Sequence, residues 1–257
     1  AGPPDLLVTD GGAWIMHPDG DDLAAVPLGL DQAQHRFKVV PGPLFLTKEL
    51  MNEHDIGPGD DTFMIGRFIS HEGKQQNTPS VRFGNIAMMP DEPLRHQYGF
   101  DQESFLVEAR SIGGYSGSPV FVYAPPFAAR PKSDGISSGM LGPWLLGVDW
   151  CHLPYTAKVR DPNNDGKPVP EDWYVEANTG MMGVIPAWKL EELMSDSEFV
   201  KQRQEIDTQI AKDRHVAQQV VLDSAERPFS REDFLRDLRK VSRRQTPPES
   251  APEADGR

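Results

Sequence analysis

Cysteine is almost absent from this chain of 257 residues. Cys151 is the only one, so no disulfide can form within the chain. A single thiol fits a reducing cytosol, although the periplasm stays compatible with it. Apolar runs are also short: none approaches the ~18 residues that a membrane-spanning helix needs, and no signal-peptide pattern is present. The sequence therefore predicts a cytoplasmic protein without a membrane span.

Positive charge is scarce as well. Lys and Arg number 26 against 39 Asp and Glu, which gives a formal net charge of -13. A surface this acidic repels phosphate backbones and anionic lipids, so neither nucleic acid nor a membrane is an expected partner. The common zinc patterns are missing, because there is one cysteine and no His-Glu-x-x-His. We therefore expect no metal and no cofactor.

Glycine and proline are plentiful, with 23 and 24 residues, and they divide the first 192 residues into short apolar segments. Such segments between tight turns are typical of a β-sandwich or barrel. Strands are predicted at residues 14–16, 23–30, 62–66, 80–84, 105–109, 119–123, 144–150 and 178–186. Helical spacing is found at 187–194, 199–222 and 234–241, and the Pro- and Glu-rich residues 245–257 are predicted to be disordered.

One turn has the composition that a catalytic nucleophile needs. Residues 113–119 read Gly-Gly-Tyr-Ser-Gly-Ser-Pro and lead into the apolar segment 120–122. Acyl transfer at neutral pH needs an unobstructed hydroxyl and backbone N–H donors directed at the developing oxyanion. Small neighbours leave the Ser116 hydroxyl open, and glycines permit the backbone conformation that points N–H groups inward. The alternative is a plain Gly/Ser turn between two strands.

This turn resembles the Gly-x-Ser-Gly-Gly/Ser-Pro signature of trypsin-like serine peptidases. Four more segments resemble that family in the same chain order, at residues 22–26, 59–66, 146–150 and 178–186. The resemblance implies a chymotrypsin-like double β-barrel in residues 1–192, with the first barrel truncated. A helical extension would occupy 193–244 and a disordered tail 245–257. The implied activity is that of a serine endopeptidase with a polypeptide substrate, and the C-terminal helices are a candidate docking site for a protein partner.

The same resemblance assigns roles to individual residues. Ser116 is the nucleophile, and the amides of Gly114 and Ser116 form the oxyanion hole. Asp22 is the acid that orients a histidine, while Asp21 is expected at the surface. Four residues lie on the strand that would pair with the substrate, of which Trp150 could equally belong to the core: Val148, Asp149, Trp150 and Cys151.

The general-base histidine is the part of the pattern that is missing. In the family it precedes the aspartate, and His17 is the only histidine before Asp22. Five strand residues span ~16 Å, so His17 is expected to be a surface turn residue instead. The other histidines lack the family's context, although His152 could line the cleft: His35, His54, His71, His96, His152 and His215. We expect the base upstream of this chain; the alternative is a catalytically inactive peptidase fold that binds peptides or proteins.

Two further motifs have weaker support. Residues 135–139 match the Gly-x-Ser-x-Gly elbow of other hydrolases. A strand rather than a helix is predicted to follow them, which favours a surface loop. Residues 161–172 begin like a calcium loop, but Pro162 within it and Asp172 at the position of the usual Glu favour a tight turn.

Cleavage specificity stays open at this point. Ala109, Arg110 and Ser111 are expected near the floor of the specificity pocket. Arg110 there would favour acidic substrate side chains, whereas Asp149 on the opposite wall would favour basic ones.

Overall fold

The computed structural model describes residues 9–30, 35–67, 78–96, 99–109, 114–125, 130–132, 135–137, 141–160 and 173–226. Side chains are described in these ranges except at 130–132, 135–137 and 217–226. The predictions that lie outside the described residues include the helix 234–241, the tail 245–257 and the turn 161–172. The chain divides into two compact units, Ala1–Ile206 and Asp207–Arg257.

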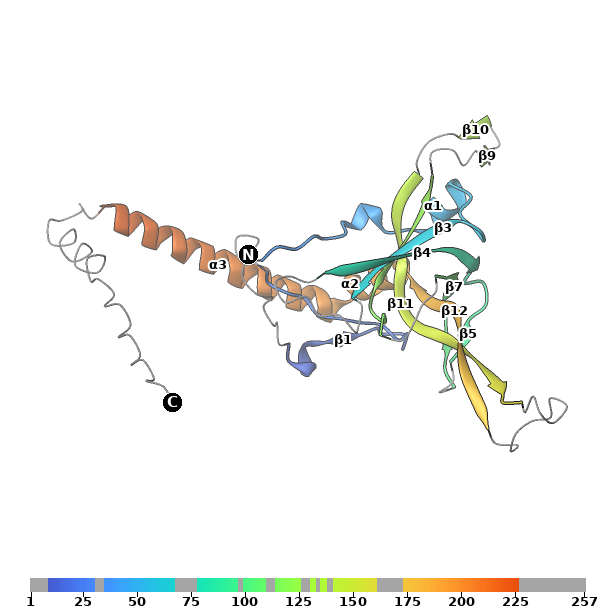
Figure 1. The fold of residues 1–257 in the computed structure, drawn as a ribbon. Helices are drawn as coiled ribbons and strands as arrows, with labels where there is room; N and C mark the ends of the chain where they lie inside the picture. The colour runs from blue at the N-terminus through green and yellow to red at the C-terminus, as the bar shows by residue number, and fades with distance from the viewer. Residues whose placement is uncertain are drawn as a thin grey trace, which may run out of the picture. The chain divides into compact units, whose positions relative to one another are not determined.

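Six antiparallel strands close into a barrel (Figure 1). They follow the order β11-β12-β7-β4-β3-β8 around it. Their bounds are β3 (Asp61–Arg67), β4 (Pro79–Met88), β7 (Phe105–Glu108), β8 (Pro119–Ala124), β11 (Leu141–Lys158) and β12 (Tyr174–Pro186). The mostly β fold is thus confirmed.

Outside this barrel, the strands of the described residues form only two-stranded sheets. These are β1 (Ile15–Met16) with β2 (Ala24–Ala25), β5 (Leu94–Arg95) with β6 (Asp101–Gln102), and β9 (Arg130–Lys132) with β10 (Gly135–Ser137). A second closed barrel is not shown in them. Within the segment 135–139 that was predicted to be a surface loop, residues 135–137 form β10, and β11 begins at Leu141.

The barrel interior is filled by alternate residues of its strands, as a period of two requires. Met64, Val120 and Leu146 are among its fully buried side chains. The strands close tightly where glycines lie: a Cβ on Gly84 would come within 1.9 Å of the Glu108 carbonyl oxygen. A Cβ on Gly147 would lie equally close to the Ile185 carbonyl oxygen. Closure therefore depends on these glycines.

Residues 35–56 are anchored to β11, and Leu46 and Ile56 of this segment belong to the main apolar core cluster. Phe45 pairs with Leu145, and the Leu46 amide donates to the Leu145 carbonyl at 3.0 Å. A short 3-10 helix, η2 (Gly42–Leu44), precedes this contact, as η1 (Gly11–Ala13) precedes β1. The helix α1 (Lys48–Glu53) follows it, and Thr47 caps α1 by accepting the Leu50 amide.

Two helices follow the barrel, α2 (Ala187–Ser195) and α3 (Ser197–Glu226). Leu193 of α2 and Phe199 of α3 are buried in one apolar cluster with Leu23, Trp150 and Ile185. The boundary predicted after residue 192 therefore falls inside α2, and the first unit extends to Ile206. No helix in the described part of the chain is both long and apolar enough to cross a membrane.

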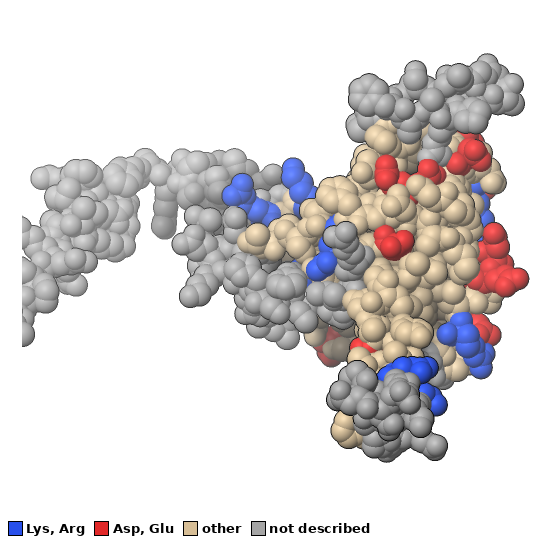
Figure 2. Space-filling view, turned by 45° about the vertical axis from the view of Figure 1, so that its right-hand side comes forward, with Lys and Arg blue, Asp and Glu red and all other residues tan. Residues whose placement is uncertain are grey.

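Charge is distributed unevenly on the face shown in Figure 2. Acidic and basic side chains lie mostly along the edges of this face, in places next to one another, around a broad area of uncharged residues. The formal charge of -13 is therefore not an even acidic coat on this face.

Candidate active site

Ser116 lies in a tight turn between the described residues Gly114 and Pro119. The Ser118 amide donates to the Tyr115 carbonyl at 2.9 Å, which closes a four-residue turn with Gly117 in its third position. Gly117 has φ +86°, the left-handed conformation that a type II turn requires at that position. Gly114 also has a positive φ, +97°. The glycines thus fix the path of the chain on both sides of the hydroxyl.

Two hydrogen bonds anchor this turn to β11. The Gly117 amide donates to the Asp149 carbonyl at 2.7 Å, and the Asp149 amide donates to the Ser118 carbonyl at 2.9 Å. Pro119 then pairs with Val148, so the ladder between β8 and β11 begins directly after the turn. The position of Ser116 is therefore set by the two strands of the barrel that flank it.

The hydroxyl and the backbone amides that the predicted chemistry needs belong to exposed residues. Ser116 and Gly114 are exposed, and the Ser116 hydroxyl donates to the Trp150 carbonyl at 3.3 Å. Among the described residues, neither the Gly114 amide nor the Ser116 amide donates to another backbone carbonyl. The oxyanion role of these two amides therefore stays a prediction.

The buried side chain of Tyr115 supports the turn, and the sequence did not indicate this role. Its side chain is fully buried inside the barrel, 2.9 Å from the Ser80 hydroxyl, and the Arg82 guanidinium lies 4.8 Å from its ring centre. Burial acts to raise the Tyr115 pKa, but the hydrogen bonds from Ser80 and Arg82 outweigh it, so the pKa is lowered. Gly66 leaves room for the ring, since a Cβ there would lie 2.4 Å from Tyr115 Cδ1.

Trp150 belongs to the core, and its carbonyl faces Ser116. Its indole N–H donates to the Ser104 hydroxyl at 3.0 Å, and its ring lies 5.2 Å from the ring of His96 and 5.9 Å from that of Phe100. Gly183 across the ladder leaves space for the indole, because a Cβ there would lie 2.4 Å from Trp150 Nε1. Val148, on the same strand, is half-buried against the same apolar cluster.

Asp149 and Cys151 flank Trp150 on β11. The Asp149 side chain is buried, with 2% of the residue exposed, and its Oδ1 has no hydrogen-bond partner among the described residues. Burial raises the Asp149 pKa to about 7. Burial also raises the Cys151 pKa to about 11, with smaller contributions from the charges of Asp149 and Asp22. Both carboxylates therefore lie within electrostatic reach of the Cys151 thiol.

Asp22 is exposed, and its backbone is held by Gln102, a second residue that sequence reasoning missed. The Asp22 amide donates to Gln102 Oε1 at 2.8 Å. Gln102 Nε2 donates to Asp21 Oδ1 at 2.6 Å and to the Glu103 carbonyl at 3.1 Å. Gln102 is fully buried, so it ties the segment that carries Asp22 to β6.

The expectation that His17 and Asp21 lie at the surface was wrong. His17 is 3% exposed, with its Nδ1 3.0 Å from Asp21 Oδ2 and its Nε2 3.5 Å from Glu192 Oε2. Lys189 Nζ lies 3.4 Å from the same Asp21 oxygen and 3.1 Å from Glu192 Oε2. The Gly20 amide donates to the His17 carbonyl, and the turn it closes brings His17 and Asp21 together. The residues Pro-Asp-Gly between them were the signal for that turn.

These ion pairs also change the pKa of Lys189. Burial acts to lower the Lys189 pKa, but its hydrogen bond to Glu192 and the charges of Asp21 and Glu192 outweigh that effect and raise it. The cluster joins the segment 17–21 to α2. His17 is therefore engaged in this cluster with Asp21 and Glu192.

The remaining histidines lie in several places. His54 stacks on Trp144 at 4.9 Å between ring centres, and His96 stacks on Phe100 at 4.7 Å. His35 is partly buried, His152 and His215 are exposed, and His71 lies outside the described residues. Within the described part, the hydrogen bond of the Ser116 hydroxyl goes to the Trp150 carbonyl and not to a histidine.

The specificity pocket is described only in part. Ala109 is buried, with its amide bonded to the Gly180 carbonyl at 3.0 Å, whereas Arg110 and Ser111 lie outside the described residues. The Asp149 carboxyl is buried and does not stand on an open wall.

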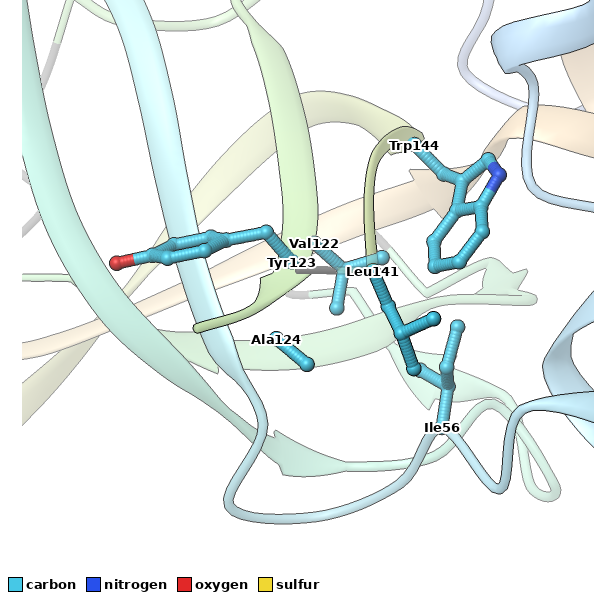
Figure 3. A pocket seen from close by; sticks show the side chains of 6 residues that line it. All are labelled: Ile56, Val122, Tyr123, Ala124, Leu141 and Trp144. Carbon is cyan, nitrogen blue, oxygen red and sulfur yellow. The ribbon is translucent and has the colours of Figure 1, made fainter. Parts of the chain in front are cut away.

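A small apolar hollow lies at another part of the barrel (Figure 3). Ile56, Val122, Leu141 and Trp144 gather around it, while the hydroxyl of Tyr123 points away. The hollow has no acid, base or nucleophile, and it shares no residue with the Ser116 turn.

Metal ligands do not gather in the described part of the chain, where no three His, Cys, Asp or Glu side chains are close enough to share an ion. In comparisons with known proteins, no family model, no curated protein and no solved structure matches this chain.

Proposed function

We propose that this chain carries the nucleophile and oxyanion part of a trypsin-like serine endopeptidase site. One observation supports this above all. Ser116 stands exposed in a turn with positive φ at Gly114 and Gly117, and the amides of Gly114 and Ser116 have no described backbone acceptor. Backbone amides beside an exposed hydroxyl are the groups that an oxyanion site uses.

The proposed reaction is peptide hydrolysis through an acyl-enzyme. The Ser116 oxygen attacks the peptide carbonyl carbon while an imidazole takes its proton, and the two amides stabilise the oxyanion. The imidazole then protonates the departing amine, which leaves an ester on Ser116, and water hydrolyses this ester. Asp22 orients the imidazole and stabilises its cation. The substrate is a polypeptide, paired with β11 next to Trp150.

The test supplies the imidazole from solution. We expect a fluorophosphonate probe to label this chain slowly, and added imidazole to raise the rate at least tenfold in a saturable manner, because it replaces the general base. Mass spectrometry should place the label on Ser116. Ser116→Ala should abolish labelling, Asp22→Asn should reduce the imidazole effect, and the control Ser118→Ala should retain it.

The rival function is an inactive peptidase fold that binds peptides. Its supporting observation is that the Ser116 hydroxyl donates to the Trp150 carbonyl and not to a base. If Ser116 is not labelled at any imidazole concentration while peptides still bind, the endopeptidase proposal is wrong and the binding function is supported.

A further inference from the structure

The buried hydroxyl of Tyr115 belongs to a chain of hydrogen bonds that ends on the barrel backbone. It lies 2.9 Å from Ser80 Oγ, and Ser80 Oγ donates to the Gly66 carbonyl at 3.1 Å. Arg82 hydrogen-bonds to the same tyrosine, and its guanidinium lies over the ring, 4.8 Å from the ring centre. Gly66 lies on β3, while Ser80 and Arg82 lie on β4. The chain of hydrogen bonds therefore joins two barrel strands to the residue that precedes Ser116.

The two ends of this chain fix the direction of every hydrogen bond in it. A guanidinium can only donate, and a carbonyl oxygen can only accept. Ser80 gives its one proton to the Gly66 carbonyl, so its oxygen accepts the proton of the Tyr115 hydroxyl. The Tyr115 oxygen accepts from Arg82 in turn. We call this directed chain, from Arg82 through Tyr115 and Ser80 to Gly66, the tyrosine relay.

The ring of Tyr115 also fits into a notch on the barrel. The side chain is fully buried, and a Cβ on Gly66 would lie 2.4 Å from Tyr115 Cδ1 and 2.6 Å from Ser118 Oγ. Any side chain at position 66 would therefore displace the ring or the Ser118 hydroxyl. Packing and the tyrosine relay thus restrain the same side chain.

This restrained residue sets the direction of the Ser116 amide. The Tyr115 carbonyl accepts the Ser118 amide at 2.9 Å. That carbonyl and the Ser116 N–H belong to one trans peptide unit, in which they point in opposite directions. The Ser116 N–H therefore points away from the Ser118 amide, and it donates to no backbone carbonyl of the described residues. Movement of the Tyr115 ring out of its notch would turn this peptide unit.

We propose that Arg82 and Tyr115 are positioning residues, which hold the Ser116 amide in the direction that an oxyanion donor needs. This inference rests on the proposed endopeptidase function and extends it. Both residues act through the Tyr115-Ser116 peptide unit and not on the substrate. A donor that already points to the place of the oxyanion needs no reorganisation during the reaction, and loss of one such donor lowers the rate about 100- to 1000-fold.

The first experiment does not depend on catalysis. Tyr115-Ser116 is the only Tyr-Ser pair in the sequence, so the full chain with 15N-serine and tyrosine labelled with 13C at its carbonyl gives one HNCO signal, that of the Ser116 amide. We expect Arg82→Met and Ser80→Ala to shift this signal by more than its line width. Arg82→Lys, which keeps a charged donor, should shift it less. The control Arg203→Met, at an exposed position of α3, should leave it in place.

The second experiment separates two constants of the imidazole-dependent fluorophosphonate reaction at Ser116. A misdirected oxyanion donor lowers the maximal rate, whereas the imidazole concentration at half-maximal rate depends on a different contact. Arg82→Met and Tyr115→Phe should lower the maximal rate about tenfold or more and change the half-maximal concentration less than twofold. Arg82→Lys should recover part of the rate, and Arg203→Met should change neither constant.

The two experiments distinguish the failure of this inference from that of the proposed function. Circular dichroism shows whether each variant is folded. An unmoved Ser116 signal or an unchanged maximal rate in folded Arg82→Met overturns the positioning role, and the second result leaves the endopeptidase proposal intact. A Ser116 signal that moves in Arg82→Met, in a chain whose Ser116 never reacts with the probe, supports the hold of Arg82 on the turn and contradicts the endopeptidase proposal.

Discussion

The hydroxyl of Ser116 and the carbonyl of Trp150 are joined by a hydrogen bond of 3.3 Å. This bond connects the exposed nucleophile turn to a strand residue whose indole is buried. Because the Trp150 indole is fixed by Ser104 and by the surrounding rings, its carbonyl is a rigid acceptor. The direction of the Ser116 hydroxyl therefore depends on core packing.

Gly183→Ala should disturb this link. The new Cβ would lie 2.4 Å from Trp150 Nε1 and 2.9 Å from Cys151 Sγ, so the indole must move. Overpacking of this kind costs about 1–3 kcal/mol, measurable by urea unfolding with tryptophan fluorescence. Gly57→Ala is the control, since no atom lies within 4 Å of its Cβ position. Equal stability of the two variants would contradict the packing described here.

Tyr115→Phe should weaken the support of the nucleophile turn. The change removes the hydroxyl that bonds to Ser80 and Arg82 and leaves those polar groups with one partner fewer. We expect a loss of about 1–3 kcal/mol in the free energy of unfolding. Tyr155→Phe, at an exposed tyrosine, should leave stability within the error of the same denaturation experiment. A similar small effect at both sites would show that the Tyr115 hydroxyl is not needed.

Asp149 should make stability fall as the pH rises. Its pKa is about 7 in the folded chain against 3.8 as the ordinary value. Between these values the unfolded chain has released the proton and the folded chain retains it, so stability declines through this window. The full penalty, up to ~4 kcal/mol, applies above pH 7. The melting temperature of Asp149→Asn relative to the unsubstituted chain should therefore be more favourable at pH 8 than at pH 5. A difference that does not change with pH would contradict the raised pKa.

Cys151 should react slowly with thiol reagents. A pKa of about 11 in place of 9.0 lowers the thiolate fraction at pH 8 roughly 100-fold. Reaction with a disulfide reagent should thus be far slower than in the urea-unfolded chain. Asp149→Asn and Asp22→Asn should each accelerate it modestly, because burial is the largest cause and remains. If neither substitution changes the rate, the two carboxyls do not act on this thiol.

Leu193 and Phe199 should behave as core residues despite their position after the predicted domain boundary. Both pack in the cluster that contains Trp150 and Ile185. Leu193→Ala and Phe199→Ala should each cost about 2–5 kcal/mol, whereas Val216→Ala, at an exposed position, should cost less than about 0.5 kcal/mol. A chain ending at residue 192 should unfold, and thermal melting would show this directly. A cooperative transition in that truncated chain would restore the earlier boundary.

Local patterns were sufficient to predict many of the elements. Alternation predicted the strands that became β4 and β7, and an apolar segment after a turn predicted β3. The spacing of Leu190, Leu193 and Met194 predicted α2. The sequence alone also indicated the turn at Ser116, since glycines are required where φ is positive. In these cases neighbouring residues carry the information, because backbone conformation and side-chain period are local properties.

Contacts between distant segments decided the rest. Nothing in the sequence linked Gln102 to Asp22, or Glu192 to His17, because 80 and 175 residues separate these partners and only the tertiary fold brings them together. The burial of Asp149 was equally hidden: an aspartate on a strand is usually exposed, and only the packing around β11 removes its carboxyl from water. The sequence by itself determined the mostly β architecture, the helices α2 and α3 and the candidate nucleophile, but not the short helix α1. The tertiary structure decided which charges are paired and which carboxyl is left without a partner, since these depend on burial and on long-range proximity.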